Sequence, residues 1–161
     1  MSARAARGAA RLAAVQALYQ MELTGADSET AVREFVEYRF GSEAETGTAG
    51  AIDTEFFAAI VRGAPLRQAE IDAAIAKVLS AEWRLSRIDS ILRAILRAAA
   101  FELIERADVP ARAVIDEYVD VSHAFFSGDE PSFVNAALDR LARRKRAAEF
   151  DEGPPDEELP Y

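Results

Sequence analysis

Apolar residues recur at the three- and four-residue spacing of an α-helix along most of the chain. Seven stretches share this pattern: residues 4–23, 28–41, 53–65, 66–79, 86–103, 110–125 and 131–148. The most regular is the fifth, whose apolar seam includes Ile91, Ile95 and Leu103. No alternation of apolar and polar positions long enough for a strand is present, and no internal repeat is seen. The pattern therefore predicts an all-α protein of about seven helices.

Residues that start or stop helices divide these stretches. Ser28 is a candidate N-cap, and Ser86 followed by Asp89 resembles a capping box that would open the fifth helix. Gly25 is placed to end the first helix, and Pro65 should break or kink the third. Residues 41–50 are polar and rich in Gly and Thr, which predicts an exposed connection.

Composition narrows the setting in which such a bundle would work. The 161 residues contain no cysteine, which excludes disulfides and thiolate metal sites and fits a reducing cytoplasm. No apolar run approaches the roughly 18 residues that span a bilayer, and the N-terminus lacks a signal-peptide core. We therefore expect a cytoplasmic protein with no membrane partner.

Charge is distributed unevenly along the chain. The net charge is −9, but six acids and no base lie in residues 149–161, so residues 1–148 carry only −3. That acidic, proline-containing end has too little apolar surface to offset the entropy of ordering. The interpretation is a single helical domain over 1–148 and a disordered acidic tail over 149–161.

Catalytic chemistry finds little support in the sequence. The chain has one histidine, His123, and neither a cysteine nor another recognisable nucleophile that it could activate. A position on the helix surface explains this histidine better. Asp116 and Asp120 share a helix face, where such a pair is normally solvated. No glycine-rich phosphate loop occurs. We expect no enzyme activity, no catalytic residue, no cofactor and no metal.

Three features suggest a binding surface. Arg4, Arg7 and Arg11 fall within a stripe of about 60° on the first helix, where they either contact phosphates or keep an alanine-rich helix soluble. The bases of residues 140–146 lie at a helix C-terminus, where they complement the helix dipole. Phe133 follows a compact turn, where an aromatic ring either stacks an unpaired base or joins the core. Trp83 is expected in the core.

Short motifs in order and register along residues 4–141 resemble the NusB transcription antitermination family. They are Ala14-Val15-Gln16-Ala17-Leu18-Tyr19, Trp83-Arg84-Leu85, Ile95-Leu96-Arg97, Phe101-Glu102-Leu103, Val109-Pro110, Ala113-Val114-Ile115-Asp116-Glu117 and Phe133-Val134-Asn135. The resemblance implies a compact bundle of two packed helical subdomains, about 4–63 and 66–148. It also implies binding of the single-stranded boxA element of ribosomal RNA transcripts as a heterodimer with ribosomal protein NusE.

Carried onto this sequence, the resemblance assigns RNA contacts to two regions. The arginine-rich start corresponds to Arg4, Arg7 and Arg11, and the loop acid and aromatic to Asp129 and Phe133. Asn135 would hold the adjoining loop or touch RNA, and helices of the second half would bind NusE. The resulting hypothesis is a non-catalytic adaptor in antitermination of ribosomal RNA operons, connected indirectly to the elongating RNA polymerase. The alternative is an acidic helical protein-protein scaffold that never binds RNA.

Overall fold

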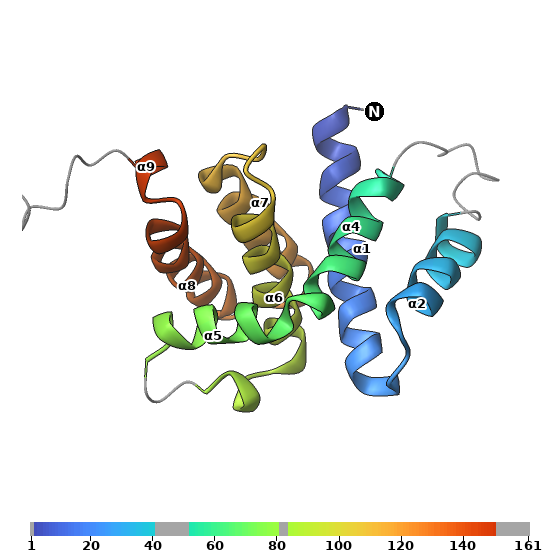
Figure 1. Cartoon of the computed structure of the whole chain (residues 1–161), viewed down its shortest axis with the longest axis horizontal. Coiled ribbons are helices and arrows are strands. Elements are labelled where there is room, and N and C mark those ends of the chain that lie inside the picture. The colour runs from blue at the N-terminus through green and yellow to red at the C-terminus, as the bar shows by residue number, and fades with distance from the viewer. Residues whose placement is uncertain (1, 41–51, 81–83, 151–161) are drawn as a thin grey trace, which may run out of the picture.

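The computed structural model describes residues 2–40, 52–80 and 84–150, and every regular element within these ranges is helical (Figure 1). The α-helices are α1 (Ala3–Thr24), α2 (Ser28–Glu34), α4 (Thr54–Leu66), α5 (Gln68–Val78), α6 (Ser90–Glu105), α7 (Ala111–Phe125), α8 (Glu130–Lys145) and α9 (Ala147–Phe150). A π-helical segment (Phe35–Phe40) continues α2, and a 3₁₀ turn (Leu85–Arg87) precedes α6. The predicted all-α class is confirmed. The short α9 is an element that periodicity did not predict.

Helix α6 is the centre of the packing. It contacts α1 and α4 on one side and α5, α7 and α8 on the other, as Figure 1 shows. Most of its circumference is buried, including Ile95, Leu96, Ala99 and Leu103. Because α1 packs on α6 and α7 as well as α4, one hydrophobic cluster runs through elements from both ends of the chain. A helix that is apolar nearly all round is expected in such a central place.

Aspartates cap three of the helices, and this corrects two sequence predictions. Asp27, not Ser28, caps α2, while the Ser28 hydroxyl donates to the carbonyl oxygen of Val61 at 3.1 Å. Asp89, not Ser86, caps α6: its carboxylate accepts from the amides of Ile91 and Leu92 at 2.7 and 3.3 Å. Ser86 lies within the 3₁₀ turn. The N-cap of the fifth helix therefore lies three residues later than the Ser-x-x-Asp pattern suggested.

The two predicted helix ends near Gly25 and Pro65 have different outcomes. Gly25 adopts φ +78° and its amide donates to the Met21 carbonyl at 2.8 Å, so it ends α1 as predicted. Pro65 lies inside the last turn of α4, which ends one residue later, and α5 begins at Gln68. Leu66 is consequently part of α4 and 86% exposed, instead of contributing to the apolar seam of α5.

The helical structure continues past residue 148, to the end of α9. Phe150 is 8% exposed and its ring lies under the guanidinium groups of Arg112 and Arg143, at 4.8 and 4.7 Å from the centroid. The Glu149 carboxylate accepts from the amide of Ala111 at 2.7 Å. The tail predicted to start at 149 is therefore wrong at its first two residues. Residues 151–161, the connection 41–50 and Trp83 lie outside the described residues.

Candidate functional site

Arg11 is buried, which corrects the prediction of a three-arginine surface stripe. Its side chain is sandwiched between α6 and α7, and the residue is 3% exposed. Nε and Nη2 donate to the two carboxylate oxygens of Glu102 at 2.8 and 2.9 Å, and Nη1 lies 3.4 Å from Glu117. The Tyr118 hydroxyl donates to the same Glu102 carboxylate at 2.5 Å. In this arrangement the guanidinium of Arg11 has no access to a phosphate.

Burial and charge act together in this cluster. Burial alone would lower the pKa of Arg11, but the hydrogen bond and negative charge of Glu102 outweigh it and raise that pKa. The pKa of the fully buried Tyr118 is raised well above its usual range by burial first and by the Glu102 charge second. Both effects keep Arg11 charged and Tyr118 protonated, so the cluster is a fixed ion pair with a neutral donor.

Arg4 and Arg7 remain at the surface, each beside an acid. The Arg4 side chain is 80% exposed, and its Nε lies 3.3 Å from Glu117. The Arg7 side chain is 34% exposed and lies 3.6 Å from the carboxylate of Asp53 and 3.9 Å from that of Asp108. Ion pairs near the surface are weak, so a phosphate can replace the carboxylate as the partner of either arginine.

A ring that sequence analysis did not single out organises this end of the molecule. Phe56 is buried at the start of α4, and the guanidinium carbons of Arg7, Arg11 and Arg106 lie 4.5, 4.8 and 4.9 Å from its centroid. Arg106 also forms a two-bond pair with Asp108 at 2.9 and 3.0 Å. The hydrogen bond from Arg106 lowers the pKa of Asp108 to about 2. Arg106 thus joins Arg4 and Arg7 as a third partly exposed cation.

No sequence signal marked Arg106. It follows the last residue of α6, outside any periodic pattern, and comes near Arg7 only because α1 and α4 pack against the end of α6. A site built from three separated segments in this way cannot be read from spacing along one helix.

Asp129 lies in the turn between α7 and α8 as the N-cap residue of α8, and Phe133 and Asn135 lie in the first two turns of α8. Asp129 is exposed, and its carbonyl oxygen accepts from the Phe133 amide at 3.1 Å as the first bond of α8. Phe133 is half-buried and lines a hollow with Val78, Leu79 and Ala137. Asn135 is exposed on α8. The role of all three in RNA contact stays a prediction.

The arginines and Phe133 lie at opposite ends of the packed pair α1 and α7. Glu117, in the first half of α7, faces Arg4, whereas Phe125 at its end lines a hollow with Gln16 and Tyr19 of α1. Helix α7 has 15 residues, a length of roughly 22 Å, and Phe133 comes after it. Tertiary structure therefore separates the arginines from the ring by about the length of a helix.

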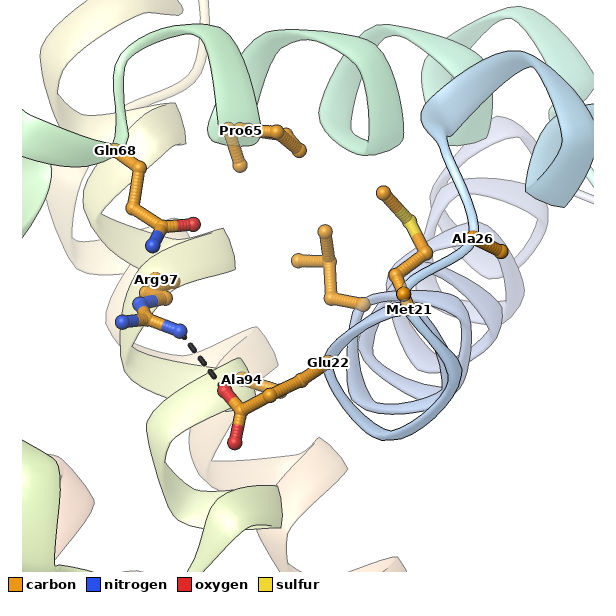
Figure 2. A pocket seen from close by; sticks show the side chains of 10 residues that line it. Met21, Glu22, Ala26, Pro65, Gln68, Ala94 and Arg97 are labelled. Atoms are coloured by element: carbon orange, nitrogen blue, oxygen red, sulfur yellow. Dashed lines mark hydrogen bonds and ion pairs between the residues drawn. The ribbon is translucent and has the colours of Figure 1, made fainter.

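A further hollow lies on the other side of α1, between the end of that helix, the α4–α5 junction and α6. Figure 2 shows Met21 and Pro65 on its walls and Glu22 accepting a bond from Arg97. Its volume is about 320 Å³. A hydrogen bond from Arg93 lowers the pKa of Glu22, so the carboxylate stays ionised within an ion-pair network. The arrangement offers neither a general base nor a nucleophile.

Within residues 2–40, 52–80 and 84–150, no three His, Cys, Asp or Glu side chains converge as metal ligands. His123 is exposed near the end of α7. No helix in this part of the chain has the length and apolar content needed to cross a bilayer.

Comparison with known proteins gives a consistent result. The model of the NusB family matches residues 8–143. The chain is 53% identical over 144 residues to a transcription antitermination protein NusB of Maricaulis maris, covering 89% of this chain and 90% of the relative. It is 51% identical over 140 residues to that of Caulobacter vibrioides, covering 87% and 94%. A solved structure of T. maritima NusB superposes with a TM-score of 0.73 at 27% identity, covering 90% of this chain and 96% of the other.

Proposed function

The chain belongs to the NusB family of transcription antitermination proteins, and from that premise we propose that it is a non-catalytic adaptor that binds boxA-like single-stranded RNA together with ribosomal protein NusE. It would act in the cytoplasm on nascent ribosomal RNA transcripts, with the elongating polymerase reached indirectly. The observation that carries the RNA part of the proposal is the exposed pair Arg4 and Arg7 on the first turns of α1.

The geometry of Arg7 supports a role in holding phosphate. Its guanidinium rests on the Phe56 ring and is flanked by Asp53 and Asp108, so the side chain is ordered before a ligand arrives. Ordering in advance reduces the entropy lost on binding. Arg4, Arg7 and Arg106 together offer three phosphate contacts, for which a slope of about −2 in log K against log salt is expected. A slope of this size means few phosphate contacts and therefore a modest electrostatic contribution to RNA affinity. A second binding partner would supply the rest of the affinity.

The separation of the two RNA regions shapes the proposal. Because Arg7 and Phe133 lie roughly a 22 Å helix apart, a strand that uses both must run along the α1–α7 side of the molecule. Each end then contributes a weak contact, and connection through one strand makes the contacts reinforce each other. NusE, bound to helices of the second half, would add a further contact of the same kind.

A salt titration with charge-matched variants tests the RNA contact. We expect Arg4→Ala with Arg7→Ala to lower the magnitude of the salt slope by about 1.4, at 0.7 for each lost phosphate contact. The control is Arg33→Ala with Arg62→Ala, which removes two exposed charges on the α2–α4 side. The measurement is fluorescence anisotropy of labelled boxA RNA between about 50 and 200 mM salt. Equal slopes for the two double variants would remove the arginines from the proposal.

The acidic scaffold is the second candidate function, favoured by the acid found beside each of Arg4, Arg7 and Arg11. Gel shift of boxA RNA with and without purified NusE separates the two. The adaptor shifts RNA, and more strongly when NusE is present. A scaffold would bind NusE and leave the RNA unshifted in both lanes.

A further inference from the structure

A groove runs between the C-terminal end of α5 and one face of α8. Two adjoining hollows form it, of about 220 and 480 Å³, which share Val78, Leu79, Ser80 and Arg140. In Figure 1, α5 lies across the start of α8 on the side of the molecule away from α2. Phe133 lines the first hollow, and Lys77 and Arg144 line the second. We call this surface the α5–α8 groove.

The helical spacing of α8 makes the groove continuous. Phe133, Arg140 and Arg144 are separated by seven and four residues, so they lie along one face of the helix. Ala136 and Ala137 lie between the ring and the cations and keep the floor low. The result is an aromatic side chain at one end of a channel and cations along the rest.

Arg140 holds the two walls together. Its Nη1 donates to the carbonyl oxygen of Val78 at 3.2 Å, which satisfies one of the terminal carbonyls of α5. A guanidinium has five N–H donors, so one such bond does not exhaust its capacity. The cation is thereby fixed over the groove instead of moving freely in solvent.

Charge in the groove is less compensated than at the start of α1. Among the described residues no acid pairs with Lys77 or Arg144, and Asp139 faces Arg143 at 2.9 Å. At the start of α1, by contrast, each arginine has a carboxylate within 4 Å. A polyanion therefore gains more from the groove, because it displaces fewer existing ion pairs.

We propose that the α5–α8 groove binds the phosphate backbone of the RNA segment that continues past Phe133. This inference rests on the proposed RNA function and extends the RNA surface from Phe133 along α8. A ring at the entrance and cations along the floor suit a single strand, whose bases stack and whose phosphates pair with the side chains. The inference also assigns a ligand to part of the basic cluster at residues 140–146, whose position the sequence alone explained by the helix dipole.

The test compares charge-matched variants of the full chain on two RNAs. One is boxA RNA. The other is the same RNA with about six unpaired nucleotides added, at one end in a first version and at the other end in a second, because single-strand binding sites have lengths of this order. For the lengthened RNA, the double variant Lys77→Ala with Arg144→Ala should have a salt slope whose magnitude is smaller by about 1.4 than that of the control Arg33→Ala with Arg62→Ala. All four side chains are exposed, so both double variants should fold.

The outcomes separate this inference from the function on which it rests. Failure of the RNA function itself shows as boxA RNA that the unaltered chain leaves unshifted with and without NusE, whatever the groove variant does. Equal slopes for the groove variant and its control on both lengthened RNAs overturn the groove. Poly-glutamate, added at the same concentration of negative charge as the RNA, should leave the lengthened RNA bound. Displacement of the RNA by poly-glutamate would assign the groove to acidic peptides instead.

Discussion

Single residues of the same type have different roles here because their surroundings differ. Arg4, Arg7 and Arg11 look equivalent along the helix, yet only the last faces the buried carboxylate of Glu102. Removing one partner of a buried ion pair strongly destabilises the folded protein, because the other charge is left buried without a partner. At an exposed pair such as Arg62 and Glu29, water replaces the missing partner.

We predict that Glu102→Ala destabilises the protein by about 3–5 kcal/mol, the usual cost of stranding one member of a buried pair. Arg11 and Tyr118 would both lose their acceptor. The measurement is the free energy of unfolding from urea titration followed by circular dichroism. Glu29→Ala, which removes an exposed carboxylate from the same kind of pair, is the control and should change little. Similar small losses in the two variants would show that the buried pair is not structurally important.

At the scale of elements, the helix starts depend on which polar side chain reaches the free amides. Ser86 and Asp89 both fit the sequence pattern for a cap, but Ser86 lies within the 3₁₀ turn Leu85–Arg87, which ends before α6 starts. The Asp89 carboxylate accepts from two amides of the first turn. Its negative charge also complements the positive end of the helix dipole.

A pair of alanine variants distinguishes these two residues. Asp89→Ala should lower stability by about 1 kcal/mol, the typical value for an N-cap. Ser86→Ala should leave the stability unchanged, because the Ser86 side chain is exposed and outside α6. The urea midpoint of each variant, at constant slope of the transition, gives the comparison. A larger loss for Ser86→Ala would restore the capping box and contradict the observed start of α6.

At the scale of the whole molecule, α6 connects two ends that carry different parts of the proposed RNA surface. The arginines and Phe56 lie where α1, α4 and the end of α6 meet. Phe133 lies beyond the other end of α7, where α8 begins, and the α5–α8 groove runs from this ring along α8. The packed core between them holds their separation constant, so one strand must fit a rigid spacing.

This separation predicts additive effects on RNA affinity. Sites more than about 10 Å apart without shared partners add to within roughly 0.5 kcal/mol. The losses from Arg7→Ala and Phe133→Ala, measured by anisotropy on lengthened boxA RNA, should therefore sum in the double variant. A coupling well above that value would mean that the two residues touch the same nucleotides, which the observed spacing does not allow.

Much of the architecture is encoded locally. Periodicity along the chain determined the all-helical class and the approximate extent of the helices, because a helix buries the same face every three or four residues. Gly25 ended its helix as predicted, since the left-handed conformation there suits glycine. The short motifs that resemble NusB proteins are sufficient to identify the family.

What tertiary structure decided was the environment of each charge. Arg11 and Glu102 are 91 residues apart in sequence, and only the packing of α1 on α6 brings them together and hides them from water. The same packing adds Arg106 to the arginines around Phe56 and places Phe133 about a helix length away. Burial and pairing depend on contacts between distant segments, and a helical period along one segment contains no information about them.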